Sequence, residues 1–222
     1  MYDSGFDGYK LNQLLSIGIM GLGKNRRLVP TRWSITATDD TICKELMKRV
    51  KTFNVLDDYR VYFGHFMGNY YLIMFFPDIF SYELFELYLP GSSWNPGDKI
   101  KIGTDYEDYG GRKGYVEQTA GGYYANRLGV AERLISLKRQ GSCLVIRFET
   151  PEYWASLGVW VVRESTRKTL ANEPVVFDTK EGMLNYVKAF IKKKFNFDIN
   201  SILRGSNLLN KVNTQSRLNQ FP

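Results

Sequence analysis

The sequence predicts an α+β fold in which a mixed, largely antiparallel sheet packs against several helices. Short runs of β-branched and aromatic residues indicate strands, and segments with apolar residues at helical spacing precede and follow them. The chain has 222 residues, 44% of them hydrophobic, which is enough to bury a sizeable core. We expect one folded domain over residues 1–204 and a flexible tail over residues 205–222.

Two helices are predicted before the first strand. Residues 11–20 can form a short helix that ends at glycines before a basic turn. Asp39, Asp40 or Thr41 can cap a second helix. Its apolar residues recur at helical spacing, at Ile42, Leu46, Val50 and Phe53.

The strands are predicted next. Residues 59–67 and 70–76 are β-branched and aromatic runs separated by a Gly-Asn pair, which is a hairpin signature. The second run is apolar at nearly every position, so it should be a central strand covered on both faces. Residues 82–89 can pair with it. Residues 97–122 fit a long exposed loop or hairpin.

Helices dominate the second half of the chain. The segment after Pro151 suggests a helix, although residues 159–162 fit a strand equally well. After residue 205 the sequence is polar, with four Asn and no core pattern, as a flexible segment requires. The other predicted elements are a helix over 123–139, strands over 143–148 and 175–177, a helix over 180–195 and a last short helix capped by Asp198.

Composition limits the classes of function. The formal net charge of +7 favours anionic partners, nucleic acid first, although a basic soluble protein without such a partner has the same charge. Cys43, Cys143 and the single histidine, His65, cannot complete a four-ligand zinc site. No apolar run is long enough to span a membrane, and the first residues lack a basic leader, so we expect a cytoplasmic protein without a membrane partner.

Two segments are candidate phosphate-binding sites. Gly121-Gly122 at the start of the 123–139 helix offers backbone N–H groups, with Tyr123 and Arg127 following, although glycine pairs also simply allow a close turn. Cations beside an aromatic ring suit phosphate contact with base stacking, and the alternative is a solvated turn. This basic block consists of Lys24, Arg26, Arg27, Arg32 and Trp33.

Carboxylates are the candidates for catalysis. Asp39 and Asp40 could hold a divalent metal through oxygen ligands, but a helix cap explains them more simply. Glu164 after Arg163 fits an ion pair at the end of an element, and the acidic cluster at 105–108 fits a solvated loop. The candidate set is Asp39, Asp40, Glu132 and Glu164.

The chain ends in Gln215-Ser-Arg-Leu218-Asn-Gln-Phe221-Pro222, a glutamine with an aliphatic residue at +3 and an aromatic residue at +6. In one short helical turn, Leu218 and Phe221 form an apolar plug while the Gln215 amide reaches a separate polar pocket. The spacing resembles the peptide by which replication and repair factors bind the sliding clamp PCNA. Such peptides usually close with two aromatics, and here Pro222 stands in the second position.

Three blocks, residues 26–40, 121–133 and 153–164, resemble the archaeal Nre family. Its members are described as DNA repair proteins that bind PCNA through a C-terminal peptide, and the terminal spacing above lies where the family places that peptide. Family members also carry a four-cysteine zinc motif in an N-terminal region, and this chain has no such set. The resemblance therefore implies the C-terminal part of the family architecture, without a cofactor.

We expect a DNA repair factor that PCNA recruits to DNA and that contacts nucleic acid through the basic block. One alternative is an enzyme acting on DNA or a nucleotide, of nuclease or transferase type. Its site would be formed jointly by residues 26–40 and 121–133, so these two blocks would have to line one pocket. The other alternative is a non-catalytic scaffold.

Overall fold

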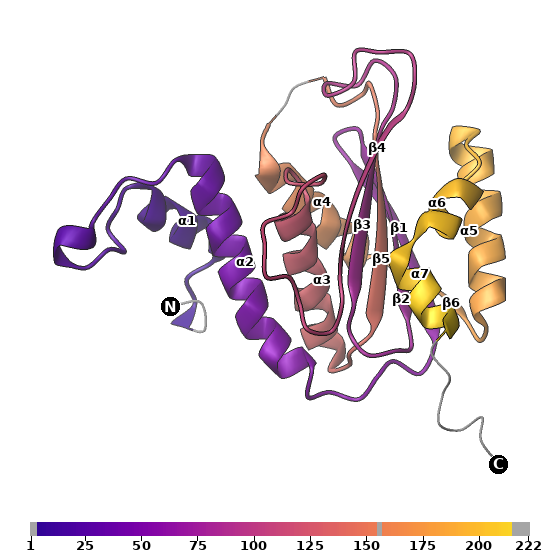
Figure 1. The fold of residues 1–222 in the computed structure, drawn as a ribbon, viewed down its shortest axis with the longest axis horizontal. Coiled ribbons are helices and arrows are strands. Elements are labelled where there is room, and N and C mark those ends of the chain that lie inside the picture. The colour runs from indigo at the N-terminus through magenta and orange to yellow at the C-terminus, as the bar shows by residue number, and fades with distance from the viewer. Residues whose placement is uncertain (1–3, 155–156, 215–222) are drawn as a thin grey trace.

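The computed structural model describes residues 4–154 and 157–214. Its centre is a six-stranded sheet with the order β4-β3-β5-β2-β1-β6 (Figure 1). Among the described strands, β3 and β5 are parallel neighbours, and every other neighbouring pair is antiparallel. The predicted α+β fold with a mixed, largely antiparallel sheet is confirmed. The strands are β1 (Tyr59–Phe66), β2 (Asn69–Phe76), β3 (Tyr82–Tyr88), β4 (Lys101–Glu107), β5 (Ser142–Glu149) and β6 (Val175–Phe177).

Helices cover both faces of the sheet. In Figure 1, α3 and α4 lie on one face and α5, α6 and α7 on the other, while α2 packs on α3 and α1 packs on α2. No helix in the described part of the chain is long and apolar enough to cross a membrane. The helices are α1 (Gly8–Ser16), the short 3₁₀ helix η2 (Gly23–Asn25), α2 (Thr31–Val50), α3 (Tyr123–Leu137), α4 (Val159–Ala171), α5 (Lys180–Phe195), α6 (Asn200–Gly205) and α7 (Asn207–Thr214).

Strand β2 lies between β5 and β1, which confirms that it is a central strand. Successive side chains of a strand point to opposite faces, so the apolar residues of β2 contribute to two hydrophobic cores, one on each face of the sheet. Ile73 and Phe75 join the core beneath α2, α3 and α4, while Leu72 and Met74 join the core beneath α5, α6 and α7. The absence of polar alternation in this run follows from burial on both sides.

Helix α2 begins at Thr31, ten residues before the predicted start. Asp39 and Asp40 therefore lie inside the helix, and the expectation that they cap it is wrong. The first turns lack apolar periodicity because they bury polar side chains, Ser34 and Thr38 among them. Pro30 immediately before Thr31 is the sequence signal of the true start.

Three further predictions needed revision. Strand β3 was predicted to pair with β2, but β5 lies between them, and β3 pairs with β4 and β5 instead. The stretch predicted as a loop or hairpin contains strand β4, which pairs with β3. Residues 159–162 are helical, and α4 begins at Val159 rather than directly after Pro151.

Helix α7 lies in the stretch predicted to be a flexible tail from residue 205. Its Leu208 and Leu209 are buried. The carboxylate of Glu83 on β3 is buried and accepts hydrogen bonds from Ser206 Oγ (2.5 Å) and from the backbone N–H groups of Asn207 and Leu208 (3.0 Å each). This carboxylate caps α7 against the sheet, a contact between residues more than 120 positions apart.

We predict that Glu83→Ala detaches α7, because it leaves the Ser206 hydroxyl and two backbone N–H groups without their acceptor. The free energy of unfolding should fall by about 1–3 kcal/mol. Hydrogen exchange should accelerate in α7 but not in α5. Glu181→Ala is the control, since its side chain is 75% exposed, and it should change stability by less than about 0.5 kcal/mol. Unchanged exchange in α7 would contradict the capping role.

Candidate functional site

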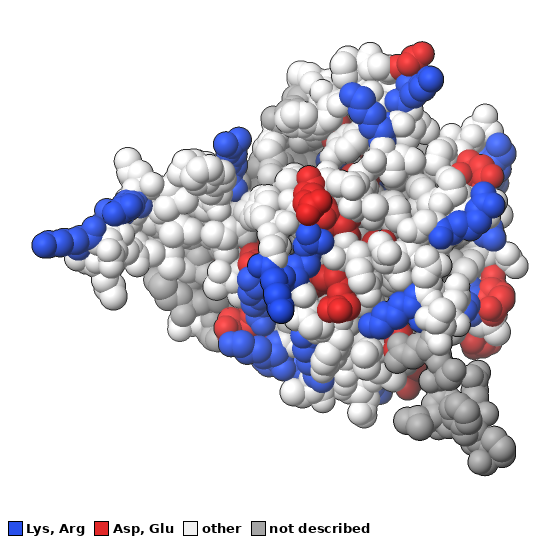
Figure 2. Space-filling view, viewed as in Figure 1, with Lys and Arg blue, Asp and Glu red and all other residues white. Residues whose placement is uncertain are grey.

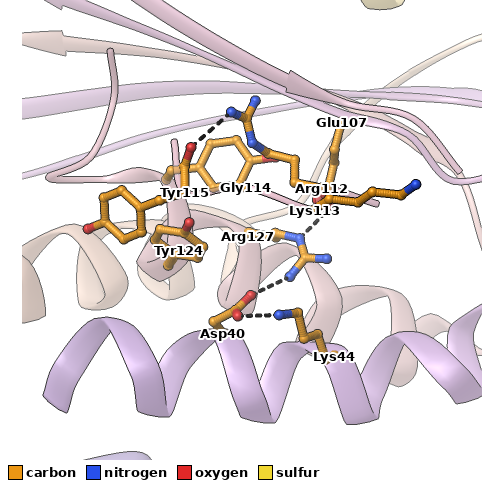
Figure 3. A pocket seen from close by; sticks show the side chains of 10 residues that line it. Asp40, Lys44, Glu107, Arg112, Lys113, Gly114, Tyr115, Tyr124 and Arg127 are labelled. Carbon is orange, nitrogen blue, oxygen red and sulfur yellow. Dashed lines mark hydrogen bonds and ion pairs between the residues drawn. The ribbon is translucent and has the colours of Figure 1, made fainter. Parts of the chain in front are cut away.

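A polar pocket of about 180 Å³ opens where α2, α3 and the loop after β4 meet (Figure 3). Three segments far apart in the sequence therefore build it, two helices and the stretch that leaves the edge strand. The pocket is lined by Asp40 and Lys44 of α2, Glu107 of β4, Arg112, Lys113, Gly114 and Tyr115 of the loop, and Tyr123, Tyr124 and Arg127 of α3.

Arg127 lies at the centre of a chain of ion pairs across this pocket (Figure 3). Its Nε donates to Glu107 Oε1 at 2.5 Å, and its Nη1 lies 3.4 Å from Asp40 Oδ1. Lys44 Nζ contacts the other oxygen of Asp40 at 2.6 Å. Burial raises the pKa of Glu107, and the Arg127 guanidinium opposes this shift without cancelling it. The chain of charges joins α2, α3 and β4.

The loop residue Arg112 is held in place from several sides. Its Nη1 donates to the carbonyl of Tyr106 at 3.0 Å and lies 3.3 Å from Asp105 Oδ1, and its Nη2 donates to the carbonyl of Tyr115 at 3.2 Å. Its Nε is buried and has no hydrogen-bond partner in the described residues. Lys113 is exposed and forms no hydrogen bond or ion pair with any described residue.

The acidic cluster at 105–108 is not the solvated loop that the sequence suggests. Asp105 and Glu107 are buried strand residues. Burial raises the pKa of Asp105, but N–H donors of residues 117–119 and the Thr119 hydroxyl outweigh it and hold the pKa below its usual range. This carboxylate fixes the loop that forms one wall of the pocket.

The basic block lies on a projecting end of the molecule, at the left of Figures 1 and 2. Its side chains are exposed, and the Arg32 guanidinium lies 5.7 Å from the centre of the Trp33 ring. Trp33 itself is 59% exposed. Lys24, Arg26 and Arg27 precede α2, Arg32 and Trp33 lie in its first turn, and none of the five residues lines the pocket.

The enzyme hypothesis requires residues 26–40 and 121–133 to line one pocket. The two blocks do meet, but only at Asp40, the last residue of the first block. Helices α2 and α3 pack against each other, and Asp40 and Arg127 line the same pocket. Tyr123 is only 1% exposed, so its side chain is unavailable for the phosphate or nucleic-acid contact expected of it. The Gly122 and Tyr123 N–H groups both donate to the Thr119 carbonyl, so they form a turn rather than the expected phosphate cradle.

Each of the four candidate catalytic carboxylates is paired with an arginine. Asp39 and Asp40 point to different helices, α4 and α3, and so do not form a metal-binding pair. Burial raises the pKa of Asp39 to about 6, against the opposing charge of Arg163. Glu164 lies inside α4 rather than at an element's end. The pairs are Asp39–Arg163 (2.5 Å), Asp40–Arg127 (3.4 Å), Glu132–Arg167 (2.6 Å) and Glu164–Arg167 (2.8 Å).

The described residues do not fit the four-cysteine zinc motif that the family resemblance implies. Cys43 on α2 and Cys143 on β5 are fully buried in the core, and His65 on β1 is exposed. Within residues 4–154 and 157–214 no group of three or more His, Cys, Asp or Glu side chains could hold a metal ion.

Sequence reasoning missed part of the pocket wall, notably Lys44, Arg112, Lys113 and Tyr115. It also missed Arg147 of β5, which donates to Glu86 at 2.5 Å, to Asn69 Oδ1 at 2.6 Å and to Glu149 at 3.0 Å. A charged residue within an apolar strand signals a buried ion pair. The loop residues gave no such signal, because an exposed Lys or Tyr is ordinary in a loop.

The terminal residues Gln215, Leu218 and Phe221 lie outside the described residues. Helix α7 ends at Thr214, immediately before them.

Fold and pocket together define an α+β protein with a charged pocket built jointly by the two halves of its chain. The chain belongs to the archaeal Nre family. The family model described as "Archaeal Nre, C-terminal" matches residues 107–221, and "Archaeal Nre, N-terminal" matches residues 1–95. The expectation that the chain represents only the C-terminal part of the family is therefore wrong, and each matched segment contributes residues to the pocket.

Named relatives agree with this assignment. The chain is 45% identical to the DNA repair protein NreA of Haloferax volcanii over 78% of its own length and 42% of that protein. It is 36% identical to the DNA repair protein NreB of Archaeoglobus fulgidus over 95% of its own length and 52% of that protein. The chain thus spans about half the length of the relatives it matches. No solved structure matches it.

We predict that neither thiol of the folded protein reacts readily. Burial raises the pKa of Cys43 to about 12 and also raises that of Cys143, so little thiolate forms at pH 8. Labelling with a chromogenic disulfide reagent should be slow in buffer and fast in guanidinium chloride, where both thiols are exposed. Rapid labelling of either cysteine in the native state would contradict the burial of these side chains.

Proposed function

We propose that the chain is a DNA repair factor that contacts DNA through its basic projection and is recruited to it by PCNA. The observation that carries the proposal is the projection, which concentrates exposed cations in a segment without any opposing charge. No acidic residue occurs between Asp7 and Asp39. The names of three relatives, all DNA repair proteins, support the repair role.

The projection suits nucleic acid in two ways. Its cations, Lys24, Arg26 and Arg27 among them, can neutralise phosphates and release their counterions. Its exposed apolar side chains can contact bases, since Leu22 is 84%, Leu28 81% and Trp33 59% exposed. A solvated turn accounts for the charges but not for this exposed apolar surface beside them.

The C-terminal spacing Gln215, Leu218, Phe221 supports recruitment by PCNA. A short peptide buries little area and must order when it binds, so we expect an affinity on the order of micromolar. The several subunits of a clamp, or simultaneous DNA contact, raise the effective affinity. Pro222 in the second aromatic position removes one apolar contact.

A second candidate function is an enzyme acting on DNA or a nucleotide. The convergence of Asp40 and Arg127 in one pocket favours it. Ion pairs with Arg127 and Arg167 engage Asp40, Glu132 and Glu164, which weighs against acid–base chemistry by these carboxylates. Asp39, whose pKa burial raises to about 6, does not line the pocket. The pocket is thus better suited to binding than to proton transfer.

To test recruitment, the whole chain is titrated into PCNA by calorimetry. Gln215→Ala combined with Phe221→Ala should abolish measurable binding, because it removes both the amide and the aromatic plug. Asn219→Ala, within the same peptide but outside the spacing, is the matched control and should bind like the unaltered chain. Unchanged binding of the double variant would contradict recruitment by PCNA through this peptide.

A separate experiment tests DNA contact. Arg26→Ala with Arg27→Ala should weaken binding to DNA and reduce the slope of log K against log salt by about 2, since two phosphate contacts are lost. Lys192→Ala with Lys193→Ala removes two exposed cations from α5, on the opposite face of the sheet, and should leave the slope unchanged. If the unaltered chain shows no salt-dependent DNA binding, the scaffold alternative is favoured.

A further inference from the structure

We propose that the pocket between α2, α3 and the loop after β4 binds a nucleotide. The phosphate lies at the end formed by Lys44, Lys113 and Arg127, and the base lies against Tyr115 and Tyr124. This site goes beyond clamp recruitment and beyond DNA contact by the projection, and it does not depend on either.

The cationic end has capacity for an added anion. The pocket lining carries four cations, Lys44, Arg112, Lys113 and Arg127, against two carboxylates, Asp40 and Glu107. Those carboxylates are already engaged by Arg127 and Lys44. Lys113 has no partner in the described residues, and Lys44 is 59% exposed at its side chain. Phosphate oxygens can therefore be bound without separating an existing ion pair.

The cations are also held in position before any ligand arrives. Arg127 is fixed by Glu107 and Asp40, and Arg112 is fixed by two carbonyl groups and Asp105. The buried Arg112 Nε is a donor without a partner in the described part of the chain.

The other end of the pocket is aromatic. Figure 3 shows Tyr115 and Tyr124 at one end, with Lys44 and Lys113 toward the opposite end. The two ring centres are 5.2 Å apart, and Tyr115 is 58% exposed. The Tyr124 hydroxyl accepts the Val116 N–H at 3.3 Å, which fixes the orientation of that ring. Rings of this kind stack on any nucleobase.

A cationic end and an aromatic end in one pocket select a molecule that carries both a phosphate and a planar base. Inorganic phosphate would use only the cations, and a nucleoside only the rings. A free 5′-mononucleotide and the 5′-phosphorylated end of a DNA strand share the required chemistry, so the experiment includes both sources.

Calorimetry on the whole chain tests the site. We expect dAMP to bind, and deoxyadenosine and inorganic phosphate each to bind at least about tenfold more weakly, because each loses one end of the pocket. A 5′-phosphorylated oligonucleotide that binds more tightly than both its 5′-hydroxyl counterpart and dAMP identifies a strand end as the ligand. Binding of dAMP with no preference between the oligonucleotides identifies the free nucleotide.

Matched variants localise the binding. Lys113→Ala and Tyr115→Ala alter exposed loop residues and should each weaken dAMP binding about tenfold. Lys48→Ala, one turn beyond Lys44 on α2 and paired with Glu45 at 2.7 Å, is the control for charge and should have no effect. Tyr186→Ala on α5 is the control for the ring.

Two results would overturn the proposal: no dAMP binding at millimolar concentration, or binding that neither Lys113→Ala nor Tyr115→Ala weakens. Equal affinity for dAMP and inorganic phosphate would show that the base does not contact Tyr115 and Tyr124, and would overturn the proposal that the ligand is a nucleotide. The Arg26→Ala, Arg27→Ala protein should still bind dAMP, so failure of the pocket and failure of DNA contact by the projection are distinguishable.

Discussion

Three buried arginines determine which polar residues lie between the sheet and helices α2, α3 and α4. Arg127, Arg147 and Arg163 are only 6%, 5% and 4% exposed. A buried charge without a partner is severely unfavourable, so each guanidinium must be matched by carboxylates or amides from other elements. Removing one partner from such a pair typically costs about 3–5 kcal/mol. The positions of the acidic residues in this half of the molecule follow from that requirement.

The same constraint changes how the acidic residues are interpreted. In the sequence, Asp39 and Glu132 resemble candidates for metal binding or acid–base chemistry. In the structure, they neutralise Arg163 and Arg167 and so connect α2 with α4 and α3 with α4. The pocket combines fixed charges with free cations, a combination that suits recognition of an anion. Acid–base chemistry in the pocket would need a carboxylate other than Asp40 and Glu107, which are both paired with Arg127.

Local patterns made much of the fold predictable. The hairpin of β1 and β2, strand β5 and helix α5 each depend on periodicity or turn residues within a short window. Three features depend on distant partners and were missed: the polar start of α2, the pairing of β3 with β5, and the capping of α7 by Glu83. The same division applies to the site. Arg127 and Asp40 belong to blocks that the sequence singles out, whereas Lys113 and Tyr115 become important only through the folding of their loop onto α3.

Helix α2 connects the projection with the pocket. Trp33, Asp40 and Lys44 are spaced by seven and four residues, which places them on one face of the helix. Trp33 and Asp40 are about 10 Å apart along the axis, at 1.5 Å per residue. Successive nucleotides of one strand in duplex DNA rise by about 3.4 Å, so this distance corresponds to about three nucleotide steps. The two proposals are therefore geometrically compatible: a strand whose phosphates contacted the projection could place its end in the pocket along the same helix face.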